Sequence, residues 1–386
     1  MKFFILLPRV PYPLEKGDKL RAYNQIKYLS RFNEIHLCAL HDSPVHKEAL
    51  NALQPFCKSI HFLKLPILLR IINLFKTIFN GKPFQAGYFF NKKNLNEINR
   101  IINEIKPDRI YCQLIRVAEY VKNQKIKKTI DYQDVFSKGI ERRISIAPFY
   151  MKPLLKAEHK RLQKYESEIF DLFDNKTIIS IPDRDLIQHP QKEKIYVIPN
   201  GVDMGYYKPL NRVKEFDLLF TGNMGYPPNI NSVIFLVKNI LPEVIKKYPC
   251  IKVLIAGASP SLKVLSLRSE NVTVTGWVKD IRECYAKSKI FIAPMQIGTG
   301  LQNKLLEAMA MKLPCITSEL ANNALCAING KNILTAITPE EYCSQIISLL
   351  ENEEKSNMIG EQGHLFVTEN YNWDINNEKL NAVIRS

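Results

Sequence analysis

The chain has 386 residues, a length at which a single hydrophobic core normally divides into two domains. Its composition, 46% hydrophobic and 24% charged, is ordinary for a packed globular protein and excludes a disordered or fibrous chain. The eight cysteines form no C-x-x-C pair and no zinc spacing with histidine, so we expect reduced thiols and no metal site.

No segment of the sequence predicts a secretion signal or a membrane span. The apolar run of residues 1–7 is shorter than a signal peptide's hydrophobic region, and Pro8, Pro11 and Pro13 follow it. No run approaches the roughly 18 apolar residues that would cross a bilayer. We therefore expect a cytoplasmic protein, with the option of peripheral attachment to the inner face of the plasma membrane.

The net charge of +16 is concentrated in the first half of the chain. Residues 1–205 contain 35 Lys/Arg and 21 Asp/Glu (+14), whereas residues 206–386 contain 19 and 17 (+2). No nucleic-acid-binding motif accompanies this charge. Lys58–Lys82 mixes apolar and basic residues and predicts an amphipathic segment that lies on an anionic membrane. The alternative is a helix packed into the domain with a solvated basic edge.

The first half of the chain alternates short apolar strands with helical stretches, which indicates a parallel sheet covered on both faces. The expected strands are Phe3–Leu7, Glu34–Leu40, Arg109–Gln113, Lys128–Asp131, Thr177–Ser180 and Ile195–Ile198, and the expected helices are Leu20–Phe32, Lys92–Ile105 and Pro153–Phe173. Lys208–Phe216 is charged and poor in large apolar residues, so it is the predicted linker.

The same alternation resumes after the linker. The expected strands are Leu218–Thr221, Lys252–Ala256 and Val272–Thr275, and the expected helices are Ile230–Lys247, Ile281–Ala286, Glu340–Glu351, Ser356–Asn370 and Trp373–Ile384. The whole chain therefore predicts an α/β protein with two parallel sheets.

Residues 290–318 predict a strand, a glycine-rich loop, a short helix and a second strand. Gly298 and Gly300 let the backbone turn tightly and approach a ligand. A helix N-terminus with Lys304 one turn inside it suits a phosphate or diphosphate. Glu307, three residues further on, could accept hydrogen bonds from ribose hydroxyls. The alternative is a surface turn with one solvated Lys–Glu pair, because a lone Gly-x-Gly is a weak signal.

Several segments, in this order along nearly the whole chain, resemble motifs of the retaining glycosyltransferases of family 4. These are Arg9–Arg21, Val197–Asp203, Phe220–Met224 and the loop and helix of residues 298–310. In the last, Glu307 matches the second of the family's two spaced glutamates, and Thr299 stands where the first would fall. The nearest subgroup resembles sugar transferases for bacterial surface polysaccharide and exopolysaccharide.

This resemblance implies the GT-B fold, in which two Rossmann-like α/β domains face each other across an interdomain cleft. Residues 1–207, joined by the helix of residues 372–386, would hold the acceptor, and residues 208–371 would bind the donor. The implied catalytic candidates are Gly17, Asp18, Lys19 and Arg21. The implied donor-binding candidates are Asn223, Gly276, Val278, Thr299, Gly300, Leu301, Gln302, Asn303, Lys304 and Glu307.

Some of these assignments leave alternatives open. Arg21 could belong to a structural network instead, and Trp277, beside the expected base-binding segment, could fill the core. Asp131 and Asp134 could line the acceptor side or cap a helix. No histidine stands beside residues 111–113, where many family members carry a catalytic one.

The implied activity is transfer of a sugar from a nucleotide-diphospho-sugar to a glycan or lipid-linked acceptor. We expect retention at the anomeric carbon, no metal and no cofactor besides the donor itself. One alternative is a nucleotide-sugar epimerase, which would need carboxylates and a histidine in the cleft. Another is a non-catalytic protein that binds acidic lipid or polymer, consistent with Thr299 at the first glutamate position. The sequence identifies neither the nucleotide nor the sugar.

Overall fold

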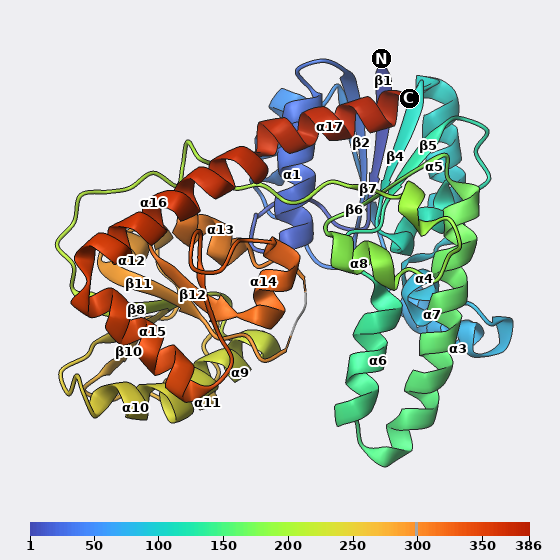
Figure 1. Ribbon diagram of the computed structural model, residues 1–386. Coiled ribbons are helices and arrows are strands. Elements are labelled where there is room, and N and C mark those ends of the chain that lie inside the picture. The colour runs from blue at the N-terminus through green and yellow to red at the C-terminus, as the bar shows by residue number, and fades with distance from the viewer. Residues whose placement is uncertain (298–299) are drawn as a thin grey trace. The chain divides into compact units, whose positions relative to one another are not determined.

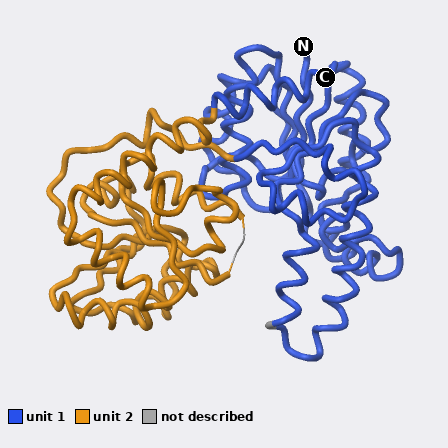
Figure 2. Tube along the Cα trace, viewed as in Figure 1, with its two compact units in different colours: residues 1–199, 374–386 blue, residues 200–373 orange. Residues whose placement is uncertain are grey.

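The structure is a computed structural model that describes residues 1–297 and 300–386, except for the side chain of Ile146. The chain forms two compact units (Figure 2). Unit 1 consists of residues 1–199 and 374–386, and unit 2 of residues 200–373. The chain thus enters unit 2 earlier than the predicted boundary at residue 207.

Unit 1 is built on a seven-stranded parallel sheet with the order β3-β2-β1-β4-β5-β6-β7 (Figure 1). The strands are β1 (Lys2–Leu7), β2 (Glu34–His41), β3 (Ser59–Lys64), β4 (Arg109–Gln113), β5 (Lys128–Asp131), β6 (Asn175–Ile178) and β7 (Tyr196–Val197). The α-helices are α1 (Gly17–Leu29), α2 (Ala49–Leu53), α3 (Ile67–Asn80), α4 (Phe84–Phe89), α5 (Lys92–Ile105), α6 (Phe136–Ile146), α7 (Lys152–Leu172), α8 (Ile181–Leu186) and α17 (Trp373–Arg385).

Both faces of this sheet are covered, as the apolar strands require. Successive side chains of a strand point to opposite faces. In β1, Phe4 and Leu6 enter a core formed with α5 and α7, whereas Phe3, Ile5 and Leu7 enter another formed with α1 and α17. Burial on two sides explains why these strands are continuous apolar runs.

Unit 2 repeats the design with a six-stranded parallel sheet of order β10-β9-β8-β11-β12-β13. The strands are β8 (Phe216–Thr221), β9 (Val253–Ala256), β10 (Val272–Val274), β11 (Ser288–Ala293), β12 (Cys315–Ser318) and β13 (Leu334–Ala336). The α-helices are α9 (Pro227–Phe235), α10 (Leu241–Ile245), α11 (Leu262–Leu265), α12 (Ile281–Ala286), α13 (Asn303–Ala310), α14 (Glu319–Leu325), α15 (Pro339–Glu351) and α16 (Glu353–Asn370).

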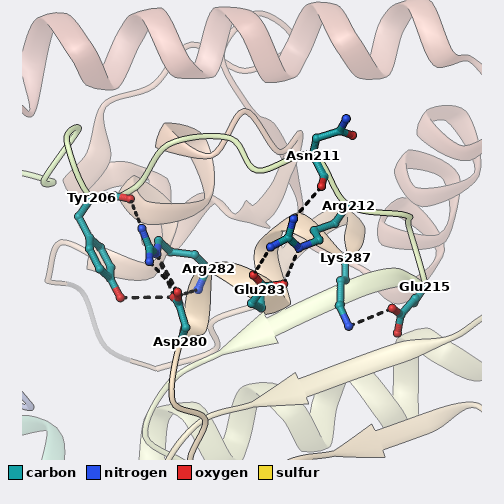
Figure 3. A network of polar contacts seen from close by, with 8 residues as sticks. All are labelled: Tyr206, Asn211, Arg212, Glu215, Asp280, Arg282, Glu283 and Lys287. Atoms are coloured by element: carbon teal, nitrogen blue, oxygen red, sulfur yellow. Dashed lines mark hydrogen bonds and ion pairs between the residues drawn. The ribbon is translucent and has the colours of Figure 1, made fainter.

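Surface ion pairs around α12 hold the first part of unit 2, including the predicted linker Lys208–Phe216, against the rest of the unit (Figure 3). Arg212 forms an ion pair with Glu283 at 2.8 Å, and Lys287 forms one with Glu215 at 3.0 Å. Arg282 donates to the backbone oxygen of Tyr206 at 3.2 Å. The predicted linker therefore belongs to unit 2, whose core its apolar residues also contact.

The last helix, α17, packs on unit 1 beside α1. Leu380 and Ile384 are buried in the core that contains Phe3 and Ile5. Polar contacts hold the same helix, with Asn33 donating to Asn381 at 3.0 Å. The carboxyl-terminal segment is thus part of the fold of unit 1.

Most of the predicted strands are present, with ends shifted by a few residues. The predicted helix Ile230–Lys247 is divided into α9, a π-helical turn (Leu236–Ile240) and α10. Pro242 explains the interruption, because it has no backbone N–H to donate within the helix. Lys58–Lys82 is wrong as one continuous segment, since it contains β3 and then α3.

A buried ion pair holds α1 to the sheet of unit 1. Arg21, whose side chain is 1% exposed, donates from Nε to Asp131 at 2.7 Å, and Asp131 is fully buried. Asp131 also accepts hydrogen bonds from Tyr111 and Thr177, both at 2.9 Å. The network therefore joins α1 to β4, β5 and β6.

Asp131→Ala should lower the free energy of unfolding of unit 1 by about 3–5 kcal/mol, because it leaves the Arg21 charge buried without its partner. Urea unfolding followed by circular dichroism measures the loss, and hydrogen exchange assigns it to unit 1. The matched control is Asp134→Ala, which removes an exposed carboxylate and should cost about 1 kcal/mol or less. Equal effects of the two substitutions would contradict this account.

Candidate functional site

The strand order of unit 2 changes direction between β8 and β11, which are neighbours in the sheet. In open α/β sheets, ligands bind outside the carboxyl ends of the strands at such a point. The loop after β8 begins with Gly222, and the loop after β11 leads to α13. These two loops and the first turn of α13 define the candidate donor site.

Glycines allow the turns at this site to pack closely against one another. Gly222 (φ 152°) and Gly257 (φ 141°) follow the adjacent strands β8 and β9. A Cβ on Gly257 would lie 1.8 Å from the carbonyl oxygen of Gly222, so only glycine allows the two turns to touch. Gly276 (φ 81°) follows β10 and accepts a hydrogen bond from the Gly257 amide at 3.0 Å.

Lys304, in the first turn of α13, reaches across to the loop after β8. Its Nζ donates to the side-chain oxygen of Asn229 and lies 4.6 Å from the ring centre of Phe220. Asn229 in turn donates to the backbone oxygen of Asn223 at 2.9 Å. Burial lowers the pKa of Lys304 to about 7, with Glu307 opposing the shift. The site therefore holds a lysine whose charge a nearby anion would restore.

Glu307, one turn further along α13, is held by aromatic hydroxyls. Tyr285 donates to its carboxylate at 2.8 Å, and the same Tyr285 hydroxyl is 2.8 Å from Thr221 Oγ1. Burial raises the pKa of Glu307, while hydrogen bonds from Tyr285 and Tyr207 oppose that shift. A carboxylate has about four lone-pair positions. Glu307 is thus fixed in place and retains capacity for further donors.

The segment before α13 leaves its backbone accessible. Gly300 has open space where a side chain would begin, and Gln302 donates to the Gly300 oxygen at 2.8 Å. Within the described residues, Gln302 gives α13 no side-chain cap, so its first N–H groups are left for a ligand. Asn303 accepts from Asn200 at 3.3 Å, and Leu301 packs on the core.

Other donor candidates lie around this edge of the sheet. Asn223 is exposed, and its side chain accepts the Gly225 amide at 2.9 Å to form the turn. Val278 packs partly on the core, whereas Trp277 is 71% exposed. The alternative of Trp277 as core filler is therefore wrong. Thr299, together with Gly298, lies outside the described residues.

The candidates of unit 1 divide into two groups. Gly17 opens α1, and Asp18 beside it forms an ion pair with Arg9 at 2.8 Å. Lys19 is half-buried and donates weakly to the backbone oxygen of Tyr12 at 3.4 Å. Arg21 requires a correction, because its enclosure with Asp131 leaves no exposed group for a substrate. Its role is to position α1, which was the structural alternative.

Gln113 and Arg116 follow β4, where the sequence lacks the expected histidine. Gln113 donates to the backbone oxygen of Asp18 at 3.3 Å, so it contacts the start of α1. Arg116 lies over the rings of Phe89 and Phe136, and burial lowers its pKa to about 10. No local pattern identifies Asn229 as the partner of Lys304 or Tyr285 as the partner of Glu307, because both contacts join distant segments.

Comparisons with known proteins agree with this architecture. Residues 215–352 match the family model described as glycosyl transferases group 1. An uncharacterized 44.6 kDa protein in the cps region of Klebsiella pneumoniae is 22% identical, with 96% of each chain covered.

Two solved structures show the same fold over the whole chain. Sucrose-phosphate synthase from Thermosynechococcus elongatus has a TM-score of 0.72 at 13% identity, covering 100% of this chain and 98% of that one. The Anabaena protein HepE, solved with UDP-glucose, has a TM-score of 0.67 at 12% identity, with 99% of each chain covered. The chain therefore has the GT-B fold, and residues 215–352, which lie within unit 2, match the glycosyl transferases group 1 family model.

Proposed function

We propose that unit 2 binds a nucleotide-diphospho-sugar at the edge of its sheet between β8 and β11. The observation that carries the proposal is Lys304, a half-buried lysine at a helix N-terminus whose contacts are an amide oxygen, a thioether and an aromatic ring. Among the residues that the structure describes, no carboxylate lies within ion-pair distance of Lys304, and a diphosphate would supply that partner. The Anabaena protein of the same fold was solved with UDP-glucose, which supports this ligand class.

In this proposal each part of the nucleotide sugar has its own partner. Lys304 and the first N–H groups of α13 bind the diphosphate. Glu307 accepts hydrogen bonds from the ribose hydroxyls, in the orientation that Tyr285 fixes. The backbone at Gly276 and Val278 lies beside the base. Residues 300–303 surround the sugar end of the ligand.

We infer a reaction with retention at the anomeric carbon, as in the family that the motifs resemble. The acceptor hydroxyl oxygen bonds to the anomeric carbon on the face that the diphosphate leaves. The bond from that carbon to the phosphate oxygen breaks, and the hydroxyl proton passes to the departing phosphate. This step depends on positive charge and helix-end N–H groups at the diphosphate, and it requires neither a protein base of high pKa nor a metal.

The biological context in this proposal is bacterial surface polysaccharide synthesis, with the acceptor a glycan or lipid-linked glycan bound by unit 1. The similar Klebsiella pneumoniae protein is encoded in a cps region, which supports this context. Gly17, Asp18 and Lys19 at the start of α1 are the proposed acceptor-side residues.

Unit 1 is also the proposed contact with an anionic membrane surface. It contains 37 Lys/Arg and 22 Asp/Glu (+15), whereas unit 2 contains 17 and 16 (+1). Among the described residues, no helix has the length and hydropathy to cross a bilayer. Attachment would therefore be peripheral, through surface residues of unit 1.

Helix α3 is the proposed docking element, because it exposes an apolar face, whereas an ordinary surface helix exposes a polar one. Its polar residues face the protein: Asn73 donates to the backbone oxygen of Phe90, and Thr77 is 2% exposed. Its apolar residues face outward, and eight of them are exposed: Ile67, Leu68, Leu69, Ile71, Ile72, Phe75, Ile78 and Phe79. A contiguous apolar face on a strongly basic unit fits an anionic lipid surface. The alternative of a helix packed into the domain with a solvated basic edge does not account for this exposed apolar face.

Lys304→Met and Glu307→Gln should each weaken nucleotide-sugar binding by about tenfold or more, because a hydrogen bond to a charged group contributes roughly 1.5–3 kcal/mol. Calorimetry with UDP-, GDP- and ADP-sugars measures the affinity of the wild type and of both variants. Lys331→Met, an exposed lysine elsewhere in unit 2, is the matched control. Unchanged affinity in both site variants would refute the site assignment.

When the protein binds its donor above pH 7, it should take up protons from solution. The pKa of Lys304 is about 7 in the free protein, and a bound diphosphate raises it. At a pH between the pKa of Lys304 in the free protein and its higher pKa in the complex, the complex therefore holds more protons than the free protein and free donor together. Donor affinity falls as pH rises through that range. Calorimetry at pH 8 in buffers of different ionisation enthalpy measures the uptake. Lys304→Met should abolish it; persistence in that variant would assign the proton to another group.

Sugar transfer should separate into donor and acceptor contributions. Asp18→Ala should lower the transfer rate by about tenfold or more and leave donor affinity nearly unchanged, whereas Lys304→Met should lower both. Product formation from a labelled nucleotide sugar measures the rate, and the configuration of the product tests retention. A protein that binds nucleotide sugar without any transfer or hydrolysis would point to the non-catalytic alternative.

Vesicle binding should rise with anionic lipid and fall with salt, because each basic residue near the surface contributes about 1 kcal/mol that salt screens. Co-sedimentation with phosphatidylcholine vesicles, with and without phosphatidylglycerol, measures it. Phe75→Ser/Phe79→Ser should reduce binding several-fold. Leu262→Ser, which removes an exposed leucine of unit 2, should not. Equal binding to neutral and anionic vesicles would refute the charge argument.

A further inference from the structure

A cavity of about 370 Å³ lies in unit 1 at the carboxyl ends of β1 and β2. One wall is the loop after β1 with the start of α1, which supplies Arg9, Lys16 and Lys19. The other wall is the loop after β2, which supplies His41, Asp42 and His46. The cavity therefore combines the acceptor-side segment with basic side chains from a second loop.

The charges of this cavity are unbalanced. Arg9 is neutralised by Asp18 at 2.8 Å. Asp42 accepts from Tyr88 at 2.8 Å and lies 3.5 Å from Arg70, so its carboxylate is engaged outside the cavity. For Lys16 and Lys19, the described residues offer no carboxylate within ion-pair distance. Burial and the neighbouring Lys16 lower the pKa of Lys19, and Asp18 and Glu15 oppose that shift.

The cavity is physically connected to the outward-facing apolar helix. Helix α3 follows β3, so it starts at the same edge of the sheet as the loops after β1 and β2. Arg70 of α3 contacts Asp42, which lines the cavity, and also donates to Tyr88 of α4. Leu68 and Ile71, next to Arg70 in sequence, are 65% and 47% exposed. A cationic cavity and an apolar surface are thus joined through one side-chain network.

We propose that this cavity binds the phosphate or diphosphate of a lipid-linked acceptor, with Lys16 and Lys19 as the anion ligands and the lipid chain lying along α3. The inference rests on the proposed transferase function and selects the lipid-linked acceptor over a free glycan. A free glycan without a charged group would leave both lysines without an anion and would make no contact with the apolar face of α3 beside the cavity. An amphiphile with a phosphate at the junction of its polar and apolar parts matches both features.

Farnesyl diphosphate, inorganic diphosphate and farnesol are the probes that separate the two features. In calorimetry on the full-length protein, farnesyl diphosphate should bind at least tenfold more tightly than inorganic diphosphate, and farnesol should bind more weakly than farnesyl diphosphate. Lys16→Ala/Lys19→Ala should weaken farnesyl diphosphate binding by about tenfold. Leu68→Ser/Ile71→Ser should weaken the binding of farnesyl diphosphate and leave the binding of inorganic diphosphate unchanged.

Two controls locate the binding and protect the interpretation. Lys58→Ala removes an exposed lysine just before β3, at the opposite edge of the same sheet, and should have no effect. Lys304→Met should also retain farnesyl diphosphate binding, because that lysine belongs to the donor site of unit 2. Thermal unfolding equal to wild type shows that all the variants are folded, and for the variants of unit 1 an unchanged nucleotide-sugar affinity shows it as well.

Three results would overturn the inference. Equal affinity for farnesyl diphosphate and inorganic diphosphate would mean a site for a soluble anion. Unchanged binding in the Lys16→Ala/Lys19→Ala variant would place the ligand elsewhere, and loss of binding in Lys304→Met would place it at the donor loop. Nucleotide-sugar binding is measured on the same preparations, so failure of the transferase proposal is recognised separately from failure of this one.

Discussion

Parallel pairing of neighbouring strands is the constraint on which both units depend. A strand in a parallel sheet can follow its predecessor only after the chain has crossed back over one face, so the loops that follow strands gather at one edge. In unit 2 the crossovers run in opposite directions from β8 and β11, and the loops after these two strands diverge. Lys304 meets Asn229 there although the two are 75 positions apart in sequence, and Gly222 lies beside Asn229. The candidate donor site follows from the strand order.

The two sheets use equivalent positions in different ways. At the centre of unit 1, the Arg21 and Asp131 charges are enclosed with Tyr111 and Thr177 and hold α1 against three strands. That position is occupied by protein, and the open cavity lies one strand further out, beside β2. In unit 2 the position between β8 and β11 is lined by glycine and by Lys304, which has no carboxylate within ion-pair distance in the part of the chain that the structure describes. The same topology thus gives a rigid support in one unit and an accessible edge in the other.

The sequence was sufficient for the features that repeat locally. Buried parallel strands are continuous apolar runs, so most strands could be predicted, and the sequence around Lys304 predicted a short helix that is present as α13. Contacts between distant segments could not. Arg21 and Asp131 are 110 positions apart, and a basic residue beside a glycine loop gives the same local signal whether it binds a ligand or a buried aspartate. The pairing of Tyr285 with Glu307 was hidden for the same reason.

The orientation of α3 also could not be predicted, because amphipathic periodicity identifies two faces without saying which one is buried. The contact of Thr77 with Gly87 shows which face is buried. The methyl carbon of Thr77 lies only 2.1 Å from the position that a Cβ on Gly87 would take. That close approach is possible only with glycine in α4 and a small side chain in α3. The polar face is therefore the one that fits, and the large apolar residues are left outside.

The two units consequently carry charge in two forms. Unit 2 is nearly neutral, and the charge of Lys304 depends on what lies beside it. With a pKa near 7, the lysine can lose its proton and so avoids the cost of a buried unpaired cation. A bound diphosphate would raise that pKa and restore the charge. Unit 1 carries a standing charge of +15 beside an exposed apolar face. A standing charge attracts any polyanionic surface, whereas a conditional one responds only to an anion that fits beside it. This division of charge is what the proposed function requires, because that function combines attachment to an acidic surface with selection of a small soluble donor.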